Sequence, residues 1–287
     1  MQLTYLQKKQ LSHYPSASAI HFFKDTFYIT GDDAQHILLL NEHLETLDTI
    51  PLFDSETARI PKKEKVDIES NLLLNIDEVP HLLLMGSGSK ERREKAVLIN
   101  LQTREKQVLS TSKFLENITA AGIEEINIEG ASTMADAVIL SNRGNKKRPS
   151  NYLIITQKSF LALQAQASVE LVKVELPTTV FLGISDIQYL AEKDELYFTA
   201  SIEHTDNSYD DGAIGDSYVG YISKFSQAIN SPIIQPTALI NLSTISPELV
   251  QHKIEGIAVA PAQKGNHLYL ISDNDDGQST VFKLLAE

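Results

Sequence analysis

Ile254-Glu255-Gly256-Ile257-Ala258 opens an apolar strand, and after a short polar turn a second strand ends in Leu270-Ile271-Ser272-Asp273-Asn274. Short apolar runs of this kind, bounded by Gly, Asp, Asn and Pro, are typical of β-strands rather than helices. The same order of features occurs elsewhere in the chain: an opening with Ser or Glu, a strand, a turn, and a second strand that ends in a polar cluster. This repetition predicts the fold.

Four more segments open in the same way. They are Ser18-Ala19-Ile20, Glu69-Ser70-Asn71, Ile128-Glu129-Gly130-Ala131 and Ile184-Ser185-Asp186-Ile187. Two further strands usually follow each pair, for example His36 to Leu40 and Leu44 to Ile50. Four antiparallel strands per unit, repeated about every 50–70 residues, are the pattern of a β-propeller blade. We therefore predict an all-β fold, a five-bladed β-propeller.

The five units account for the chain, so we predict a single domain over residues 1–287, with blades that start near residues 17, 68, 127, 183 and 253. The fifth unit ends after its third strand, Thr280 to Leu285. The N-terminal strand, Leu3 to Lys8, can supply the missing fourth strand, which closes the ring and removes an exposed edge. Short helices are expected in loops at Thr111 to Ala121 and Ser246 to Gln251. The alternative is a β-sandwich followed by a smaller β domain, because the repeats are weak in sequence.

The composition excludes several classes of protein. Lys and Arg number 25 against 38 Asp and Glu, a net charge of −13, and a surface this acidic repels nucleic acids and anionic membranes. No apolar run approaches the roughly 18 residues of a membrane span. The absence of cysteine rules out disulfides and Cys-ligated metals. With no secretory signal visible, we expect a cytoplasmic monomer; a leader removed before residue 1 would leave the same sequence.

The repeat places one residue of every blade around the central axis. The first strand of a blade lines the channel, so the residues that open these strands form one ring: Ser18, Glu69, Glu129, Ser185 and Glu255. Three converging carboxylates repel each other unless they are protonated or bind a cation. Ca²⁺ fits best, because it accepts oxygen ligands in loose geometry, whereas zinc prefers His or Cys. The alternative is that these residues only mark strand starts and face solvent.

The loops between second and third strands are long and charged, and they emerge at the same end as this ring. Blades two and three carry basic residues there, including Lys146-Lys147-Arg148, whereas blades four, five and one carry acidic residues. Functional residues are often found in such loops. A basic side facing a metal ion suits a small anionic ligand such as a phosphate. For the basic triplet alone, a solvated loop is the competing interpretation.

Several of these segments resemble the calcium-activated nucleotidases (apyrases), five-bladed propellers whose axial Ca²⁺ is held by a ring of Ser and Glu in this order. The similar segments are Ile128 to Ala131, Ile184 to Tyr189 with Lys193-Asp194, and Lys253 to Ile257. Gly86-Ser87-Gly88-Ser89-Lys90-Glu91 is similar to that family's Gly-Ser-x-Gly-Lys-Glu segment. The chain also resembles bacterial propellers of unknown function related to the esterase-like phytase domain, which share the Gly-Ser-Gly-Ser and Glu-Gly signatures.

The chain departs from the nucleotidase pattern at two places. Asp32-Asp33-Ala34-Gln35-His36 stands where the nucleotidases have Asp-Asp-Arg-Thr-Gly, and Ser132-Thr133-Met134 stands where they have Trp-Ser after the third-blade Glu. The acids are kept and the Arg is lost. The bacterial propellers of unknown function are therefore the nearer likeness, and that likeness implies no activity.

Together these observations predict a Ca²⁺-binding propeller whose leading activity is hydrolysis of a small phosphorylated molecule at the metal. The residues assigned to this site are the bases Asp33 and Glu203 and the ligand contacts Ser87, Ser89, Arg93, Arg143 and Asp273. Two alternatives stay open. One is a non-catalytic ligand- or protein-binding propeller in which an axial Ca²⁺ ties the blades together, and the other is a lactone hydrolase.

Overall fold

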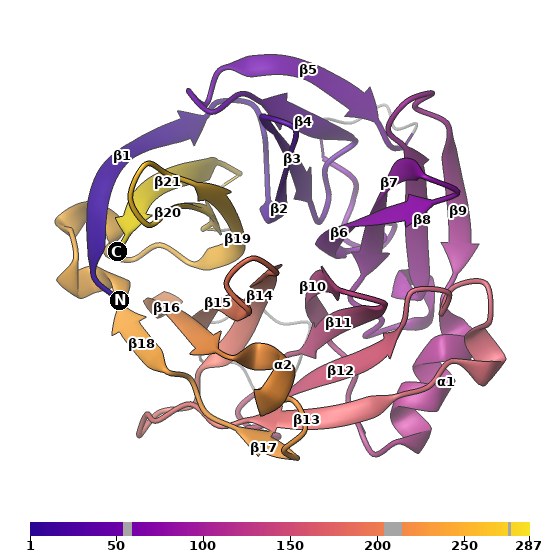
Figure 1. Ribbon diagram of the computed structural model, residues 1–287. Coiled ribbons are helices and arrows are strands. Elements are labelled where there is room, and N and C mark those ends of the chain that lie inside the picture. The colour runs from indigo at the N-terminus through magenta and orange to yellow at the C-terminus, as the bar shows by residue number, and fades with distance from the viewer. Residues whose placement is uncertain (54–58, 204–213, 275–276) are drawn as a thin grey trace.

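Five small, mostly antiparallel sheets stand around a central axis in the computed structural model, as Figure 1 shows. The structure describes residues 1–53, 59–203, 214–274 and 277–287, without the side chains of Glu203 and Ile214. Each sheet is one blade. In four of the blades the first strand in the chain lies nearest the axis, whereas in the fifth the N-terminal strand is the outermost one. The arrangement confirms the predicted five-bladed β-propeller and rules out the β-sandwich.

Within each blade the strands follow one another from the axis outward. Blade 1 contains β2 (Ala17–Phe23), β3 (Thr26–Gly31), β4 (His36–Leu40) and β5 (Thr46–Pro51), and blade 2 contains β6 (Ile68–Ile76), β7 (Val79–Gly86), β8 (Lys95–Asn100) and β9 (Lys106–Ser110). Blade 3 contains β10 (Ile128–Met134), β11 (Ala137–Asn142), β12 (Asn151–Gln157), β13 (Glu170–Val174) and β17 (Ile233–Ile234). Blade 4 contains β14 (Gly183–Leu190), β15 (Glu195–Glu203), β16 (Ile214–Ser223) and β18 (Ala238–Asn241), and blade 5 contains β19 (Ile254–Pro261), β20 (Asn266–Asp273), β21 (Ser279–Ala286) and β1 (Leu3–Leu11).

The two ends of the chain close the ring within blade 5. Strand β1 pairs antiparallel with β21, so that Leu3 lies opposite Ala286 and Leu11 opposite Ser279. The backbone N–H of Gln2 also donates to the carbonyl of Glu287 over 2.8 Å, and the two termini lie close together in Figure 1. The predicted closure by the N-terminal strand is confirmed, and β1 extends three residues beyond the predicted Lys8.

Each boundary between neighbouring blades contains its own apolar core, and there are five such clusters among the described residues. Strand β7 shows why its sequence is apolar without interruption. Leu82 and Leu84 pack toward blade 1, whereas Leu83 and Met85 pack toward blade 3. Successive side chains of a strand point to opposite faces, so a blade that is covered on both sides needs apolar residues at every position.

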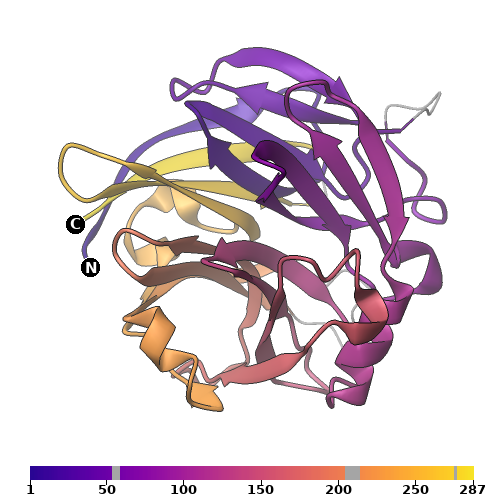
Figure 2. The same cartoon turned by 45° about the vertical axis from the view of Figure 1, so that its right-hand side comes forward.

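The connections carry short helices, two of which lie where the sequence predicts them. Helix α1 (Ser112–Ala120) lies on the outside of the ring beside blades 2 and 3, as Figure 2 shows, and its Phe114 packs on Phe160 with the ring centroids 4.7 Å apart. The segment after Ser246 forms only a single 3-10 turn, η4 (Pro247–Leu249). The other short elements are α2 (Phe225–Ala228) and the 3-10 turns η1 (Glu91–Arg93), η2 (Gln164–Gln166) and η3 (Leu242–Thr244).

Candidate metal site at the channel mouth

A β-bulge interrupts the innermost strand of every blade at the same position. The pairing with the second strand skips one residue in each case, and the skipped residues are Ser18, Glu69, Glu129, Ser185 and Glu255. A bulge leaves the extra residue outside the regular ladder and re-aims its side chain. The five residues predicted to form a ring are therefore structurally equivalent. They lie where the inner strands begin and the second strands end, which we call the mouth of the channel.

The two serines of this set are engaged with the protein itself. The Ser18 hydroxyl donates to the carbonyl of Ile68, so it joins blade 1 to blade 2. The Ser185 hydroxyl lies 3.4 Å from that of Ser201 in the adjacent strand of blade 4. Both ring serines are buried.

Two of the three ring glutamates have cationic partners from the chain. Arg143 lies with its Nη1 atom 3.2 Å from Glu129 Oε2 and 3.8 Å from Glu255 Oε2. Glu255 is also paired with Lys253 over 2.8 Å. The sequence predicts that Arg143 holds a phosphate, but its exposed fraction is only 5%. Its positive charge therefore pairs with carboxylates of blades 3 and 5 inside the propeller.

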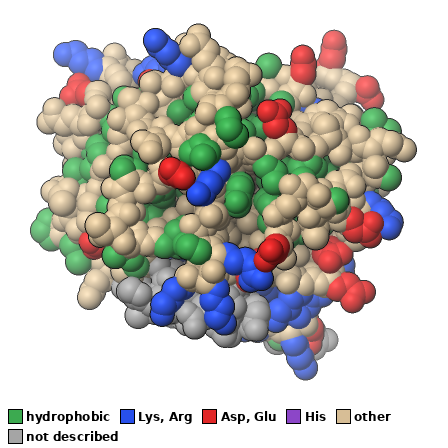
Figure 3. Space-filling model, turned by 90° about the horizontal axis from the view of Figure 1, so that it is seen from below, with side chains coloured by type: hydrophobic (Ala, Val, Ile, Leu, Met, Phe, Trp, Pro, Cys, Tyr) green, Lys and Arg blue, Asp and Glu red, His purple; other side chains and the backbone are tan. Residues whose placement is uncertain are grey.

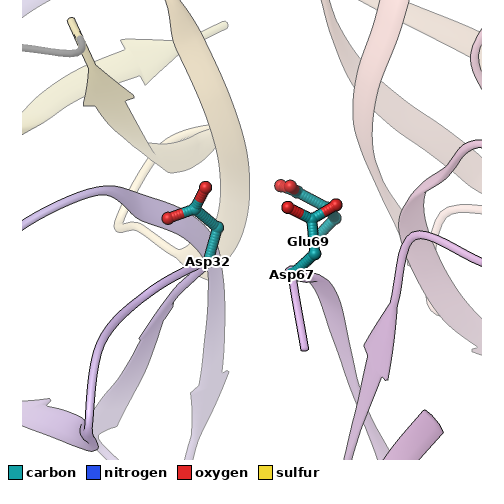
Figure 4. A group of neighbouring side chains, drawn as sticks. All are labelled: Asp32, Asp67 and Glu69. Atoms are coloured by element: carbon teal, nitrogen blue, oxygen red, sulfur yellow. The ribbon is translucent and has the colours of Figure 1, made fainter. Parts of the chain in front are cut away.

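Glu69, the third ring glutamate, has a different environment. It lies near Asp67, which precedes β6, and near Asp32, which follows β3 of blade 1, as Figure 4 shows. One carboxylate oxygen from each of the three lies within 4.8 Å of the others. Glu69 makes no hydrogen bond or ion pair with the other described residues. Burial, and then the charges of Asp67 and Glu129, raise the pKa of Glu69 well above its ordinary value.

The three carboxylates share two cations. The Lys65 ammonium contacts Asp32 and lies 3.1 Å from Asp67 Oδ1, and Arg93 Nη1 lies 2.7 Å from Asp67 Oδ2. Among the residues that the structure describes, no third cation pairs with these carboxylates to balance the remaining negative charge of the cluster. Burial raises the pKa of Asp32 to about 6 although Lys65 opposes this shift, and Asp32 Oδ1 is buried without a hydrogen-bond partner.

The predicted ligand contacts of blade 2, Ser87, Ser89 and Arg93, lie close together. Their polar groups are directed at the carboxylate of Asp67 and at one another. The hydroxyl of Ser87 donates to Asp67 Oδ2 over 2.7 Å and lies 2.9 Å from the Ser89 hydroxyl. Arg93 donates to that same Ser89 hydroxyl over 2.8 Å. This network holds Asp67 in place. Arg93 and Arg143, both predicted to be ligand contacts, pair with different carboxylates.

The remaining predicted residues are placed as follows. Asp33 is buried and accepts a hydrogen bond of 2.8 Å from Arg59 Nε. Asp273 is half-buried at the end of β20. Glu203 ends β15, but its side chain lies outside the described residues, as does most of the acidic loop that follows it.

The basic loop residues of blade 3 are at the surface. Lys and Arg side chains gather with acidic ones along one margin of the molecule in Figure 3. Lys146, Lys147 and Arg148 are all exposed. Arg148 lies 3.0 Å from Glu124 and 2.9 Å from Glu125, so part of the predicted basic side is neutralised by neighbouring acids.

Two further charged residues of the site, Lys65 and Asp67, do not emerge from the comparison of repeats. The signal for them is present in Lys65-Val66-Asp67-Ile68-Glu69, where every second residue is charged. Alternate residues of a regular strand point to the same side, but Asp67 has a positive φ of 64° and Glu69 lies in the bulge. The meeting of Lys65, Asp67 and Glu69 therefore depends on the local backbone as well as on this spacing. The contribution of Asp32 cannot be found in this way, because it depends on the packing of blade 1 against blade 2.

The fold and its mouth define the class of the protein: a five-bladed β-propeller with buried, partly uncompensated carboxylates at one end of its axis. The chain belongs to a family of unknown function, DUF6929, whose model matches residues 13–285. No curated protein matches the sequence. None of the helices in the described part of the chain is long and apolar enough to cross a membrane.

Solved structures that are similar in fold include the following two. One is the glutaminyl cyclase of Myxococcus xanthus, with 11% identity and a TM-score of 0.56 over 99% of this chain and 97% of that chain. The other is the major allergen Mala s 1 of Malassezia sympodialis, with 11% identity and a TM-score of 0.54 over 93% of this chain and 92% of that chain. At this identity the likeness concerns the fold alone, and the resemblance to nucleotidases stays a prediction.

Proposed function

We propose that this protein is a Ca²⁺-binding propeller that holds one ion at its mouth through Asp32, Asp67 and Glu69. The observation that carries this proposal is the meeting of three carboxylate oxygens within 4.8 Å, in a cluster whose charge is not fully compensated. Such a charge is neutralised by a proton on Glu69 or by a cation. The buried Asp32 Oδ1, which has no hydrogen-bond partner, is an acceptor that a cation would satisfy.

The donor set favours Ca²⁺ over other metal ions. All three groups are carboxylates, the chain contains no cysteine, and no histidine belongs to the cluster, so the soft or nitrogen-rich sites of zinc and copper do not match. Ca²⁺ accepts 6–8 oxygen ligands in irregular geometry. Three carboxylates from the chain would leave room for water and for an oxygen atom of a ligand. The proposed set retains only Glu69 of the predicted ring.

The ligand proposed for this ion is a small anionic molecule, and the proposed reaction is hydrolysis of a phosphoester or phosphoanhydride. A bound Ca²⁺ polarises phosphoryl oxygens and neutralises developing charge. The proposal assigns this role to the ion because Arg93 and Arg143, the arginines predicted as ligand contacts, are buried in ion pairs with carboxylates. The proposal of hydrolysis, rather than binding alone, rests on the short sequence segments that resemble the calcium-activated nucleotidases.

Calcium binding is tested by calorimetric melting of protein that has been stripped with EGTA and then titrated with Ca²⁺. A ligand present at 100 times its Kd stabilises the folded state by roughly 2.7 kcal/mol, so the melting temperature should rise by several degrees. Glu69→Gln should abolish the rise. Glu192→Gln, at an exposed residue in the turn between β14 and β15, is the matched control and should respond as the parent does. An unchanged parental Tm rejects the proposal.

The reaction is tested separately with nucleotides, phosphorylated metabolites and sugar lactones, each with and without Ca²⁺. Hydrolysis that requires Ca²⁺ and is lost in Glu69→Gln supports the proposed enzyme. Turnover of lactones alone favours the lactonase. Binding of Ca²⁺ without turnover of any substrate leaves the non-catalytic propeller as the better description.

A further inference from the structure

We infer that Arg143 is the chain's own counter-ion for the axial ring and that it restricts metal binding to the side of the mouth formed by blades 1 and 2. The first half of this inference stands on the contacts of Arg143. The second half rests on the proposed function.

The guanidinium of Arg143 contacts three blades. Its Nη1 atom lies 3.2 Å from Glu129 of blade 3 and 3.8 Å from Glu255 of blade 5. Its Nη2 atom donates to the hydroxyl of Ser201 in blade 4 over 2.9 Å. A guanidinium is always charged and presents its donors in a rigid planar fork. Arg143 therefore occupies the place between ring carboxylates in which the sequence predicts Ca²⁺.

The backbone makes room for this arrangement at Gly183. A Cβ atom added to Gly183 would lie 2.2 Å from Arg143 Nε and 2.8 Å from its Cγ, so any other residue would displace the side chain. The start of the Arg143 side chain is held as well, because its backbone N–H donates to the carbonyl of Asn127 over 2.9 Å. Two features independent of the ion pairs thus direct the guanidinium toward the axis.

The charges then divide the mouth into two halves. Glu129 and Glu255 are buried, and a divalent cation beside them would be repelled by the Arg143 guanidinium and by the Lys253 ammonium. Glu69 forms no ion pair with Arg143. Within the described part of the chain, the half of the ring left for a metal is the one that Glu69 shares with Asp32 and Asp67.

The decisive experiment removes the proposed metal site at Glu69 and tests whether loss of Arg143 creates a new one between Glu129 and Glu255. In a Glu69→Gln background, which lacks the proposed site, Arg143→Gln leaves Glu129 and Glu255 facing each other without a guanidinium. The EGTA-treated double variant should melt several degrees below Glu69→Gln. Ca²⁺ should recover most of this loss, and equilibrium dialysis should find one bound ion. Glu69→Gln alone should show no Ca²⁺ response.

Two controls separate charge from packing. Arg143→Lys in the same background keeps the cation and should not respond to Ca²⁺. Adding Glu129→Gln to Arg143→Gln removes the carboxylate nearer to Arg143 and leaves Glu255 paired with Lys253, so the melting temperature should recover without any metal. If Arg143→Gln does not fold, recovery in this charge-matched variant supports the inference, and failure to recover shows that Arg143 acts by packing, which overturns it.

An Arg143→Gln double variant that melts like Glu69→Gln and ignores Ca²⁺ also overturns the inference. Failure of the proposed function has a different signature, because it appears in the parent protein as a melting temperature that Ca²⁺ does not change. The double variant can still gain a site in that case.

Discussion

The carboxylate of Asp186 in blade 4 accepts a hydrogen bond of 2.9 Å from the backbone N–H of Ile257 in blade 5. Its other oxygen accepts one of 2.8 Å from the N–H of Ile187, and the backbone of Ala131 in blade 3 lies near enough to lower the pKa of Asp186. One side chain thus satisfies backbone donors of two blades and lies beside a third. Burial raises the pKa of Asp186 well above its ordinary value, although these hydrogen bonds oppose the shift.

Asp186→Ala should therefore destabilise the whole ring rather than one blade. A buried donor left without a partner costs about 1–3 kcal/mol, so leaving the N–H groups of Ile187 and Ile257 without their acceptors should lower the free energy of unfolding by about 2 kcal/mol or more. Asp186→Asn keeps one acceptor oxygen and should fall between the alanine variant and the parent. Urea unfolding measures all three, and an alanine variant as stable as the parent would contradict the assignment.

The approach of Arg143 to Gly183 predicts a strong coupling between the two positions. Gly183→Ala should cost about 2 kcal/mol, as overpacking of a filled site does. In an Arg143→Ala background the added methyl group meets no arginine, so the same change should cost close to nothing. A double-mutant cycle by urea unfolding measures the difference. Equal costs in both backgrounds would show that the Gly183 backbone, and not the arginine, disfavours alanine.

The raised pKa of Glu69 predicts how the stability of the metal-free protein depends on pH. When the pKa of an acid is higher in the folded state than in the unfolded state, where it is about 4.3 for Glu, ionisation of the acid destabilises the folded protein. This loss of stability is absent below the unfolded-state pKa, grows as pH rises, and is complete above the folded-state pKa. In EGTA the parent should therefore lose stability from mildly acidic pH toward pH 8.

Glu69→Gln should remove part of this slope and should be the more stable protein at pH 8 without Ca²⁺, by roughly 1.4 kcal/mol for each unit of pKa shift. The pKa of Asp32 is raised to about 6, so Asp32 also makes stability fall as pH rises. It should account for part of the pH dependence that remains in Glu69→Gln. Urea unfolding across this pH range measures both proteins. An identical slope in the two would mean that Glu69 ionises normally.

Lys65 and the proposed Ca²⁺ compete for the same two carboxylates. Lys65→Gln removes the ammonium between Asp32 and Asp67 and should raise the Ca²⁺ affinity by about tenfold, which corresponds to about 1.4 kcal/mol. Lys63→Gln is a matched control, because Lys63 is well exposed and pairs only with the exposed Glu64 over 3.7 Å among the described residues. Isothermal titration compares the two variants, and an unchanged affinity in Lys65→Gln would place the ion elsewhere.

The repeat, the blade count and the closure by β1 follow from local sequence. Strands recur with short turns, and a strand with both faces covered is apolar at every position, as Leu82 to Met85 show. The ring positions also follow, because Ser18, Glu69, Glu129, Ser185 and Glu255 occupy the same place in each repeat and the closed propeller makes such places equivalent.

Only the tertiary structure decided which charges meet at the mouth. Arg143 and Glu255 are separated by more than 100 residues, and Asp32 reaches Glu69 only because blade 1 packs against blade 2. Electrostatic interactions depend on distance and burial in space, neither of which is encoded in the spacing of residues along the chain. The sequence by itself therefore determined the ring of positions, whereas the folded molecule determined that Arg143 neutralises one half of it and leaves the other half, around Glu69, to a proton or a cation.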